Sequence, residues 1–321
     1  MTAEAPGEVV SLAEQRARAR ASKDFAAADD IRDRIAELGW NVVDERGGGW
    51  RLEPASPATP EAPEEGTART HARDVDPVLD RAAAFDATLH WIVEGWPEDV
   101  ERGIGSFRAH AAGRSLQFVV TDVAGEDSTR WGDDVEVLSL EEGTGWGAAR
   151  NAGLKRTLGR TVLVLDGSIE ATGDVLGALE TTLADDGVGV CGPFGIVTED
   201  LRQFDEAPGP GDCDAIEGYL MAMRREVLTD VGLFDEKFTW YRTADIEFSF
   251  RVKDRGLRAV VTPAPVAKHE HRMWFETDPA TRAKWSKRNY YRFLEKFRGR
   301  YDLCVHPKPP DAAESPSSRR R

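Results

Sequence analysis

After residue 76 the sequence alternates between strand-like and helix-like segments, and this alternation limits the possible folds more than any other pattern in the chain. The strand candidates are short, apolar and rich in β-branched residues; they are residues 89–93, 116–121, 135–138, 161–165 and 188–191. Between them, apolar residues recur at helical spacing, as in the helix expected to begin at Pro97. This pattern predicts an α/β domain with a mostly parallel central sheet and helices on both faces.

A proline-rich segment divides the chain. Residues 54–63 contain four prolines among Ala, Ser, Thr and Glu, and an acidic run that contains glycine follows them. Because such a composition cannot bury an apolar core, we predict a linker over residues 54–75. It separates a small unit, residues 1–53, from a large domain, residues 76–305. Residues 306–321 are rich in Pro and Ser and are predicted to be a disordered tail.

The small unit is predicted to be a helical hairpin domain followed by two short strands. Residues 12–22 are rich in Ala and Arg, and residues 25–38 place apolar side chains at helical spacing before Gly39. Residues 40–43 and 49–52 flank a glycine-rich turn, as the two strands of a β-hairpin do.

Charge and cysteine content exclude several classes of protein. The formal net charge of −15 argues against a general affinity for nucleic acid, because phosphate contacts depend on Lys and Arg. Cys191, Cys213 and Cys304 lack the spacing of a zinc or redox site and are expected to pack as small apolar groups. The sequence has no apolar run of transmembrane length and no signal-like amino terminus, so we expect a cytoplasmic protein without a transmembrane segment.

Two aspartates stand directly after predicted buried strands. Asp122 follows residues 116–121, and Asp166 follows residues 161–165. In open α/β sheets, ligands bind beyond the carboxyl ends of the strands, so both carboxylates are candidates for a binding site. Capping of the next helix or initiation of a turn is the alternative role for each of them.

Several blocks of sequence, in this order and at these distances, resemble family 2 glycosyltransferases. They are residues 145–153 (GWGAARNAG), the strand that ends at Asp166, and residues 222–225 (AMRR), 231–236 (VGLFDE) and 245–251 (DIEFSFR). The resemblance implies the Rossmann-like GT-A fold and a hexosyltransferase-like activity. It also implies a nucleoside-diphosphate-sugar donor, inversion at the anomeric carbon, and an acceptor that the sequence does not identify: a glycan, a lipid-linked molecule or a small molecule.

The resemblance assigns three residues to the donor. Asp122 corresponds to the carboxylate that reads the donor's base, and Arg150 to a basic residue near the donor. Asp166 corresponds to the first acid of an Asp-x-Asp motif that binds a divalent cation, manganese or magnesium. Here the third position is Ser168, a hydroxyl in place of the usual carboxylate, which leaves metal dependence open. Glu170 is a candidate to supply the missing charge, unless it and Ser168 only shape the loop.

The acceptor side of the resemblance rests on residues after 216. Asp245 matches the aspartate that takes a proton from the acceptor hydroxyl, with Ala244 in place of the usual Glu. Helix N-capping by Asp245 can coexist with that role. Glu217 and Gly218 fall in the family's loop near donor sugar and acceptor, although a simple backbone turn also explains the glycine. His271 matches a late histidine that approaches the metal or diphosphate; an exposed histidine is the alternative.

Two further patterns predict packing. Glu247 is expected to form a salt bridge with Arg251, four residues later. Residues 282–300 contain eight basic residues and one acidic residue. Aromatic residues lie between them at the spacing of a buried helix face. They predict an amphipathic terminal helix whose basic face lies in water. Contact with an anionic acceptor, or peripheral attachment at the inner face of a membrane, is the second interpretation.

The small unit resembles a different family. Residues 16–33 (RARARASKDFAAADDIRD), followed by Gly39 and Trp50, are similar to the carboxyl-terminal helical tail of cysteinyl-tRNA synthetases. The resemblance implies RNA docking through residues 1–53; a hairpin kept for packing or self-association is the alternative. The leading hypothesis for the whole chain is an inverting glycosyltransferase. The second is a catalytically inactive GT-A binding or regulatory protein that docks on RNA.

Overall fold

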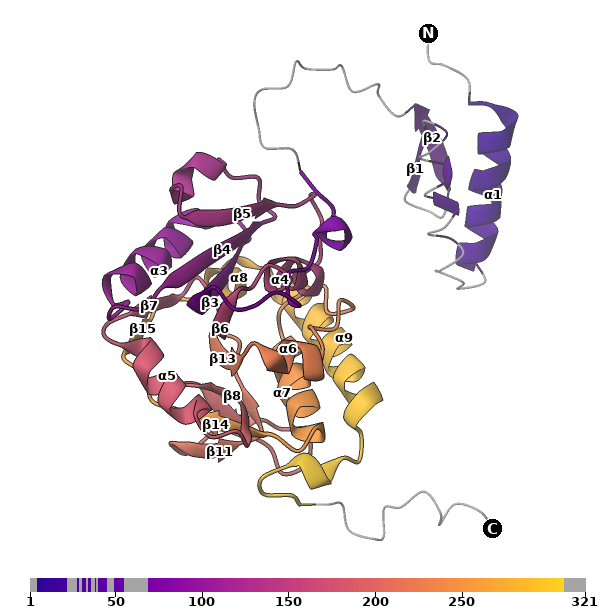
Figure 1. Ribbon diagram of the computed structural model, residues 1–321. Helices are drawn as coiled ribbons and strands as arrows, with labels where there is room; N and C mark the ends of the chain where they lie inside the picture. The colour runs from indigo at the N-terminus through magenta and orange to yellow at the C-terminus, as the bar shows by residue number, and fades with distance from the viewer. Residues whose placement is uncertain are drawn as a thin grey trace, which may run out of the picture. The chain divides into compact units, whose positions relative to one another are not determined.

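The computed structural model describes residues 5–21, 28, 31–32, 34–35, 38, 40–44, 49–54 and 69–308. The chain divides into two compact units, Met1–Gly66 and Thr67–Arg321. Figure 1 shows both units, and each is described here by itself.

The first unit combines a helix with a β-hairpin. Helix α1 spans Gly7–Ala21, and strands β1 (Trp40–Asp44) and β2 (Trp50–Pro54) pair in an antiparallel register. Val9, Leu12, Ala13, Ile35 and Trp40 form its buried core. The predicted hairpin strands are confirmed, and the first helix begins five residues earlier than residue 12. Of the second predicted helix, the described residues 28, 31–32 and 34–35 are helical and residue 38 is in a turn; the others lie outside the described residues.

The second unit is built on an eight-stranded sheet with the order β11-β14-β8-β13-β6-β3-β4-β5. Strands β3 (Phe85–Val93), β4 (Leu116–Asp122), β5 (Val135–Ser139) and β6 (Gly159–Leu165) are mutually parallel neighbours. Strand β13 (Leu220–Arg224) runs antiparallel between β6 and β8 (Val188–Gly192). Strand β14 (Arg258–Val261) is parallel to β8, and β11 (Gly211–Cys213) pairs antiparallel with β14 at the edge.

Helices cover both faces of this sheet, as predicted. On one face lie α3 (Pro97–Ala109) and α5 (Val175–Leu183); on the other lie α4 (Trp146–Leu154), α6 (Glu226–Asp230) and α7 (Ala244–Asp254). Figure 1 shows the sheet between α5 and α7. Residues of β6 alternate between the two cores: Leu163 and Leu165 pack with α3 and α5, whereas Val162 and Val164 pack with α4 and α7. This two-residue period is that of a strand buried on both faces.

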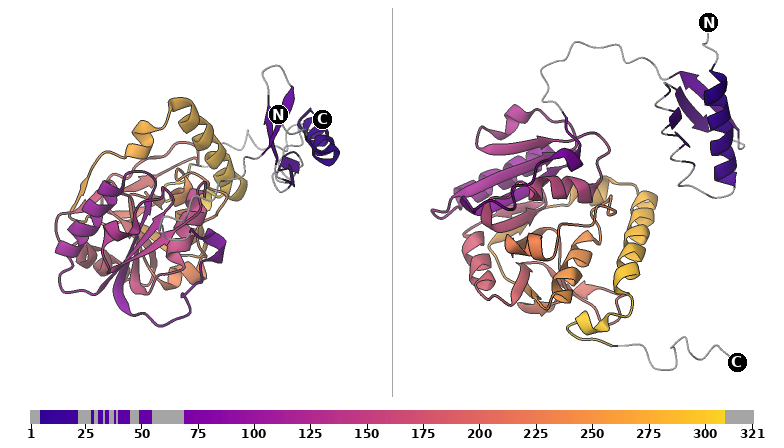
Figure 2. Two further views of the ribbon diagram at one scale, coloured as in Figure 1. Left: turned by 90° about the horizontal axis from the view of Figure 1, so that it is seen from above. Right: turned by 45° about the vertical axis from the view of Figure 1, so that its right-hand side comes forward.

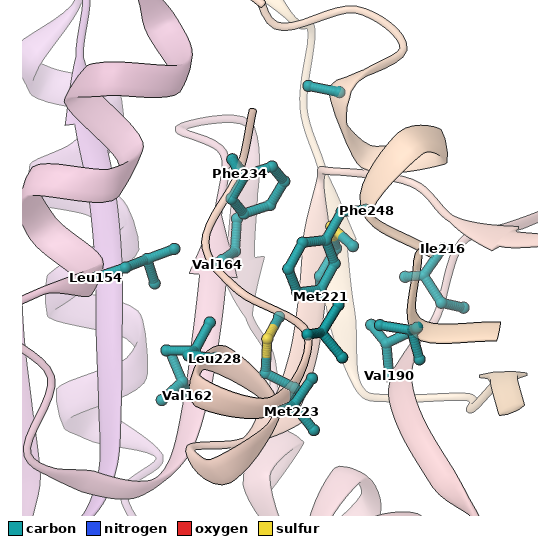
Figure 3. Close-up of a cluster of buried hydrophobic side chains, with 14 of the residues drawn as sticks. Leu154, Val162, Val164, Val190, Ile216, Met221, Met223, Leu228, Phe234 and Phe248 are labelled. Carbon is teal, nitrogen blue, oxygen red and sulfur yellow. The ribbon is translucent and has the colours of Figure 1, made fainter. Parts of the chain in front are cut away.

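The second core is dense in Met and Phe. Figure 3 shows Met221 and Met223 of β13 beside Val162 and Val164 of β6, under Phe234 and Phe248. The rings of Phe234 and Phe248 stack with centroids 4.7 Å apart. All three cysteines are buried and free, as expected for small apolar groups.

Helix α9 (Pro279–Phe297) packs outside α7. Its first turn is fixed by Asp278, whose carboxylate accepts hydrogen bonds from the backbone N–H groups of Ala280 and Thr281. Phe293 and Phe297 pack against Phe250 of α7, which confirms the predicted amphipathic helix. Figure 2 shows α9 along one flank of the second unit.

Two small sheets flank the main one. Strand β7 (Ile169–Ala171), just after Asp166, pairs with β15 (Val266–Lys268). Strand β9 (Gly195–Val197) lies between β10 (Asp205–Glu206) and β12 (Ala215–Ile216). Short helices complete the unit: η1 (Ala72–Asp74), η2 (Ser128–Trp131), α8 (Arg272–Glu276) and η3 (Tyr301–Leu303).

The predicted linker over residues 54–75 is too long at its carboxyl end. Thr70 forms a β-bridge with Leu140, and Val75 is buried in the core that contains Leu154. Residues 69–75 therefore belong to the second unit, because their backbone pairs with the sheet edge and Val75 gains burial there. Residues 309–321, most of the predicted tail, lie outside the described residues.

Gly153 in α4 permits an unusually close approach between α4 and β3. A Cβ atom at this position would overlap the imidazole of His90, which is fully buried. We expect Gly153→Ala to lower the free energy of unfolding by about 1–3 kcal/mol, because neither the ring nor the helix has room to move. Gly105→Ala in α3 is the matched control, since a Cβ there has nothing within 4 Å. Urea denaturation of both variants checks this; equal stability of the two would contradict it.

Candidate active site

A cavity of about 370 Å³ opens where β6 and β13 meet the loops before α7 and after β15. Its lining includes most of the residues that the sequence assigned to chemistry: Arg150, Asp166, Glu217, Gly218, Asp245 and His271. Residues of β9, α7 and α9 and of the loops beside β9, β13 and α7 complete the wall, among them Arg202, Tyr219, Tyr241, Arg242 and Tyr290. The size lies at the lower end of the range of ligand-binding pockets.

Asp166 sits at the carboxyl end of β6, as predicted. Its backbone N–H donates to the carbonyl of Tyr219, and its Oδ1 accepts a hydrogen bond from the N–H of Ser168 at 2.8 Å. Its Oδ2 lies 3.0 Å from Nε2 of His271. Burial raises the pKa of Asp166, but the contacts with His271 and Ser168 outweigh it and hold the pKa below its usual value. The carboxylate is therefore ionised at neutral pH.

His271 points into the cavity, and His269 does not line it. The Nδ1 of His271 accepts a hydrogen bond from the backbone N–H of Trp274, so Nε2 carries the proton that faces Asp166. The ring packs against Tyr241, with centroids 4.7 Å apart. His269 instead contacts Glu170 at 2.7 Å, and Glu170 lines neither this cavity nor the smaller one beside it. Of the two histidines, His271 has the position that the sequence favoured.

A second, smaller cavity of about 40 Å³ lies on the other side of Asp166 and His271. Glu94, which follows β3, and Ser168 line it. Burial, and then the charge of Asp166, raise the pKa of Glu94 to about 7. The hydroxyl of Ser168 is buried and, within the described part of the chain, has no hydrogen-bond partner.

Asp166, His271 and Ser168 fit a divalent cation that takes its remaining ligands from a substrate and from water. Among the residues that the structure describes, there is no cluster of three or more His, Cys, Asp and Glu side chains with the geometry of a metal site. Asp166 and His271 are nevertheless adjacent, and the unpartnered Ser168 hydroxyl belongs to the same loop. Magnesium-type sites often use one or two protein ligands and complete the shell with substrate phosphates and water.

Arg150 is a buried residue of the cavity lining. Its guanidinium donates to the backbone carbonyls of His90, within β3, at 2.8 Å and of Leu165, the last residue of β6, at 3.2 Å, and it stacks over Trp146. Burial lowers the pKa of Arg150 to about 10, while the charges of Glu94 and Asp166 oppose that shift. Arg150 thus remains protonated at neutral pH and places one buried positive charge beside two carboxyl groups.

Asp245 is held by two backbone amides. Its Oδ2 accepts a hydrogen bond from the N–H of Gly218 at 2.8 Å, and its Oδ1 one from the N–H of Ile246 at 2.9 Å. Burial raises the pKa of Asp245 in spite of these bonds. Glu217, next to Gly218, also has a raised pKa, because of burial and then the charge of Asp245. The loop at Gly218 thus contacts Asp245 directly, a contact that the sequence did not predict.

Thr243 begins α7 in a left-handed conformation. Its φ of 74° is unusual for a β-branched residue, and the residue lines the cavity. Strained backbone of this kind tends to occur where function requires a fixed geometry. Here it sets the direction of the chain between Arg242 and Asp245.

Asp122 is placed outside both cavities. It ends β4 and is buried, and its carboxylate accepts three backbone hydrogen bonds, from Ala124, Gly125 and Glu126, at 2.8–2.9 Å. These contacts are those of a residue that initiates a turn, which is the alternative role predicted for Asp122.

Glu247 forms the predicted ion pair with Arg251, at 2.8 Å, and a second with Lys296 of α9.

Parts of the chain are similar to known proteins. Residues 120–247 match the model of glycosyl transferase family 2, a span that includes Asp166 and Asp245. The second unit therefore contains a region similar to family 2 glycosyltransferases, which covers less than half of the chain. The fold is that of GalNAc-T7, solved with UDP, GalNAc and Mn2+, with a TM-score of 0.53 and 17% identity over 66% of this chain and 48% of that chain. The chain thus spans about half of that relative.

Two other relatives were found. The mannosyltransferase PcManGT from Pyrobaculum calidifontis, solved with GDP-Man and Mn2+, gives a TM-score of 0.45 and 18% identity over 70% of this chain and 78% of that one. Residues 2–50 match the model of the cysteinyl-tRNA ligase anticodon binding domain. Over 53 residues the chain is 53% identical to the cysteine–tRNA ligase of Opitutus terrae, which is 16% of this chain and 11% of that protein.

Several residues that line the two cavities carry no sequence signal of their own. Arg202, Tyr241 and Arg242 lie in loops without periodicity, and Glu94 follows a strand as many surface residues do. Glu94 could have been found only by looking for a carboxylate directly after β3, as was done for β4 and β6.

Among the described residues, no helix is both long and apolar enough to cross a membrane.

Proposed function

We propose that the protein is an inverting glycosyltransferase that moves a sugar from a nucleoside-diphosphate-sugar donor to an acceptor hydroxyl, with Asp245 as general base. One observation carries the proposal: Asp245, fixed by two amides, and the Asp166–His271 pair line the same cavity. A base and a site for a leaving diphosphate are the two elements that such a displacement requires.

The donor side of the proposal rests on Asp166, His271 and Arg150. Asp166 and His271 would hold a divalent cation, which, when bound, supplies positive charge to the leaving diphosphate. Arg150 adds a buried positive charge and links β3 to β6 through the carbonyls of His90 and Leu165. Asp122 contributes indirectly, since its three hydrogen bonds shape the loop after β4.

On the acceptor side, Asp245 would accept the proton of the attacking hydroxyl. Each carboxylate oxygen accepts one backbone hydrogen bond, which leaves a lone pair on each for the acceptor. The N–H of Gly218 holds the base in place, and Glu217 adds a second carboxyl group at the cavity wall.

Nucleotide release tests the proposal. Purified full-length protein is incubated with UDP-, GDP- and dTDP-hexoses, with manganese or with EDTA, and free nucleotide and donor affinity are measured. We expect at least one donor to bind and to release nucleotide in the presence of manganese. Absence of binding and release for every donor would refute a transferase.

A cation with only two protein ligands should bind weakly until the diphosphate arrives. We therefore expect manganese affinity, followed by the EPR signal of free Mn2+, to rise when UDP is added. His271→Ala should weaken the UDP-dependent binding by at least about 10-fold, because it removes a nitrogen ligand. His269→Ala is the matched control, since His269 contacts Glu170 outside the cavity. Equal manganese affinity in both variants would exclude His271 as a ligand.

We propose RNA docking as the function of the first unit. The match of residues 2–50 to an anticodon binding domain supports it. Residues 1–53 contain eight basic and eleven acidic residues, so binding would depend on a specific surface and not on excess positive charge. Gel-shift titration with total tRNA should show binding by the full chain that is lost when residues 1–53 are deleted. Equal binding without them would reject this role.

A further inference from the structure

Two arginines of the cavity wall take no part in the chemistry described so far. Arg202 lies in the loop after β9, and Arg242 lies two residues before α7. Both line the cavity that contains Asp245. Within the described residues, neither guanidinium forms an ion pair or a hydrogen bond; Arg242 rests on the ring of Trp274, at 4.8 Å. Both positive charges are therefore available to a ligand.

Neighbouring residues of one helix hold the two arginine loops in place. The side-chain amide of Asn289 in α9 donates to the backbone carbonyls of Trp240 and Arg242, at 2.9 and 2.7 Å. The hydroxyl of Tyr290, the next residue, donates to the carbonyl of Leu201 at 3.1 Å. Because Asn289 is buried and Tyr290 also lines the cavity, α9 fixes both loops against the same space.

Backbone strain marks both positions. In the described part of the chain, three residues other than glycine have a positive φ, and two of them adjoin these arginines: Leu201 with 61° and Thr243 with 74°. Leu201 is buried in the core with Phe250 and Phe293, so Arg202 has a fixed starting point. Strained residues that the surrounding structure holds in place are common at ligand sites.

The arginines share the large cavity with Asp245 and also with the Asp166–His271 pair of the donor side. The charge of Arg242 acts on Asp245 and Glu217 of the acceptor side. Asp166 and His271 separate the large cavity from the small one, which adjoins β3. Asp245 lines only the large cavity, and a general base must touch the acceptor. Guanidinium groups bind phosphate and carboxylate oxygens through paired hydrogen bonds. A local pair of cations is also needed to attract an anion to a chain with a net charge of −15.

We infer that Arg202 and Arg242 bind an anionic group, a phosphate or a carboxylate, on the acceptor. The inference rests on the proposed function, since it treats the cavity around Asp245 as the acceptor site. The acceptor, or its terminal unit, is then a small anionic molecule, and the arginines select it against neutral sugars. Arg202 and Arg242 position the acceptor and leave the donor untouched.

The test uses three probes that share one ring: glucose, glucuronate and glucose 6-phosphate. Binding to the full chain is measured by NMR titration at low salt, with UDP and manganese present so that the donor side is occupied. We expect one or both anions to bind at least about 10-fold more tightly than glucose, and added salt to reduce the difference. The stronger of the two anions identifies the group.

Substitution separates this role from a structural one. Arg202→Gln and Arg242→Gln should each weaken binding of the preferred anion about 10-fold, and the double variant should bind all three probes alike. Arg255→Gln is the matched control, because Arg255 is exposed and does not line the cavity. The melting temperature and UDP affinity should not change in any variant. Equal binding of the three probes to the unaltered chain, or a preference that survives the double substitution, overturns the inference.

Failure of this inference can be told apart from failure of the proposed function. If donors bind and release nucleotide but the probes bind alike or not at all, the transferase stands and the anionic acceptor falls. If no donor binds under any condition, the transferase itself falls, whatever the probes show.

Discussion

Replacement of Asp245 by Asn is expected to reduce sugar transfer by about 100- to 10,000-fold, the usual contribution of a general base. The amide keeps the size of the side chain and one oxygen acceptor for the N–H groups of Gly218 and Ile246. It cannot accept the acceptor's proton, so kcat should fall while donor affinity stays within about twofold. Asp230→Asn, on the exposed end of α6, is the matched control.

The pH profile provides a second readout for the same base. A base works only when ionised, and burial raises the pKa of Asp245 above its usual value. Activity should therefore fall on the acid side at a higher pH than an exposed aspartate would give, and the residual activity of Asp245→Asn should lack that acid limb. Full activity in Asp245→Asn, with the same acid limb, would assign the base to another residue, with Glu217 the nearest candidate.

Much of the fold could be predicted from local sequence because its signals are local. β6 is apolar at consecutive positions, since Leu163 faces one core and Val164 the other, and this continuous run indicates a buried strand. The position of Asp166 follows directly, because it is the first residue after that strand. The Glu247–Arg251 pair is equally local, four residues apart on one helix.

Other features depend on contacts between distant segments and could not be predicted. Asp122 obeys the same strand-end rule as Asp166, yet its carboxylate is used by the three amides that follow it. The roles of Arg202 and Arg242 depend on Asn289 and Tyr290, which bring two irregular loops to one cavity. No periodicity marks such a loop, because its conformation is set by tertiary hydrogen bonds and not by a repeating apolar face.

The cavity floor should be the most sensitive part of the domain to loss of a single charge. Arg150→Met removes the donor to the carbonyls of His90 and Leu165 and the positive charge beside Glu94 and Asp166. Removal of one partner from a buried set of charges costs about 3–5 kcal/mol. We expect a loss of that size in the free energy of unfolding, measured by urea denaturation at pH 7.

A second arginine, Arg156, serves as a control that separates the loss of a buried charge from the loss of a partly exposed one. Arg156→Met removes an arginine just beyond α4 whose ion pair with Glu136 is partly exposed, so its cost should stay near 1 kcal/mol or below. Arg150→Lys should keep the positive charge but not both hydrogen bonds to the two carbonyls, so it should recover only part of the lost stability. The pKa of Glu94, about 7 in the intact protein, should rise in Arg150→Met because a positive neighbour is lost. If Arg150→Met and Arg156→Met cost the same, Arg150 contributes no more than a surface charge, and the cavity floor does not depend on it.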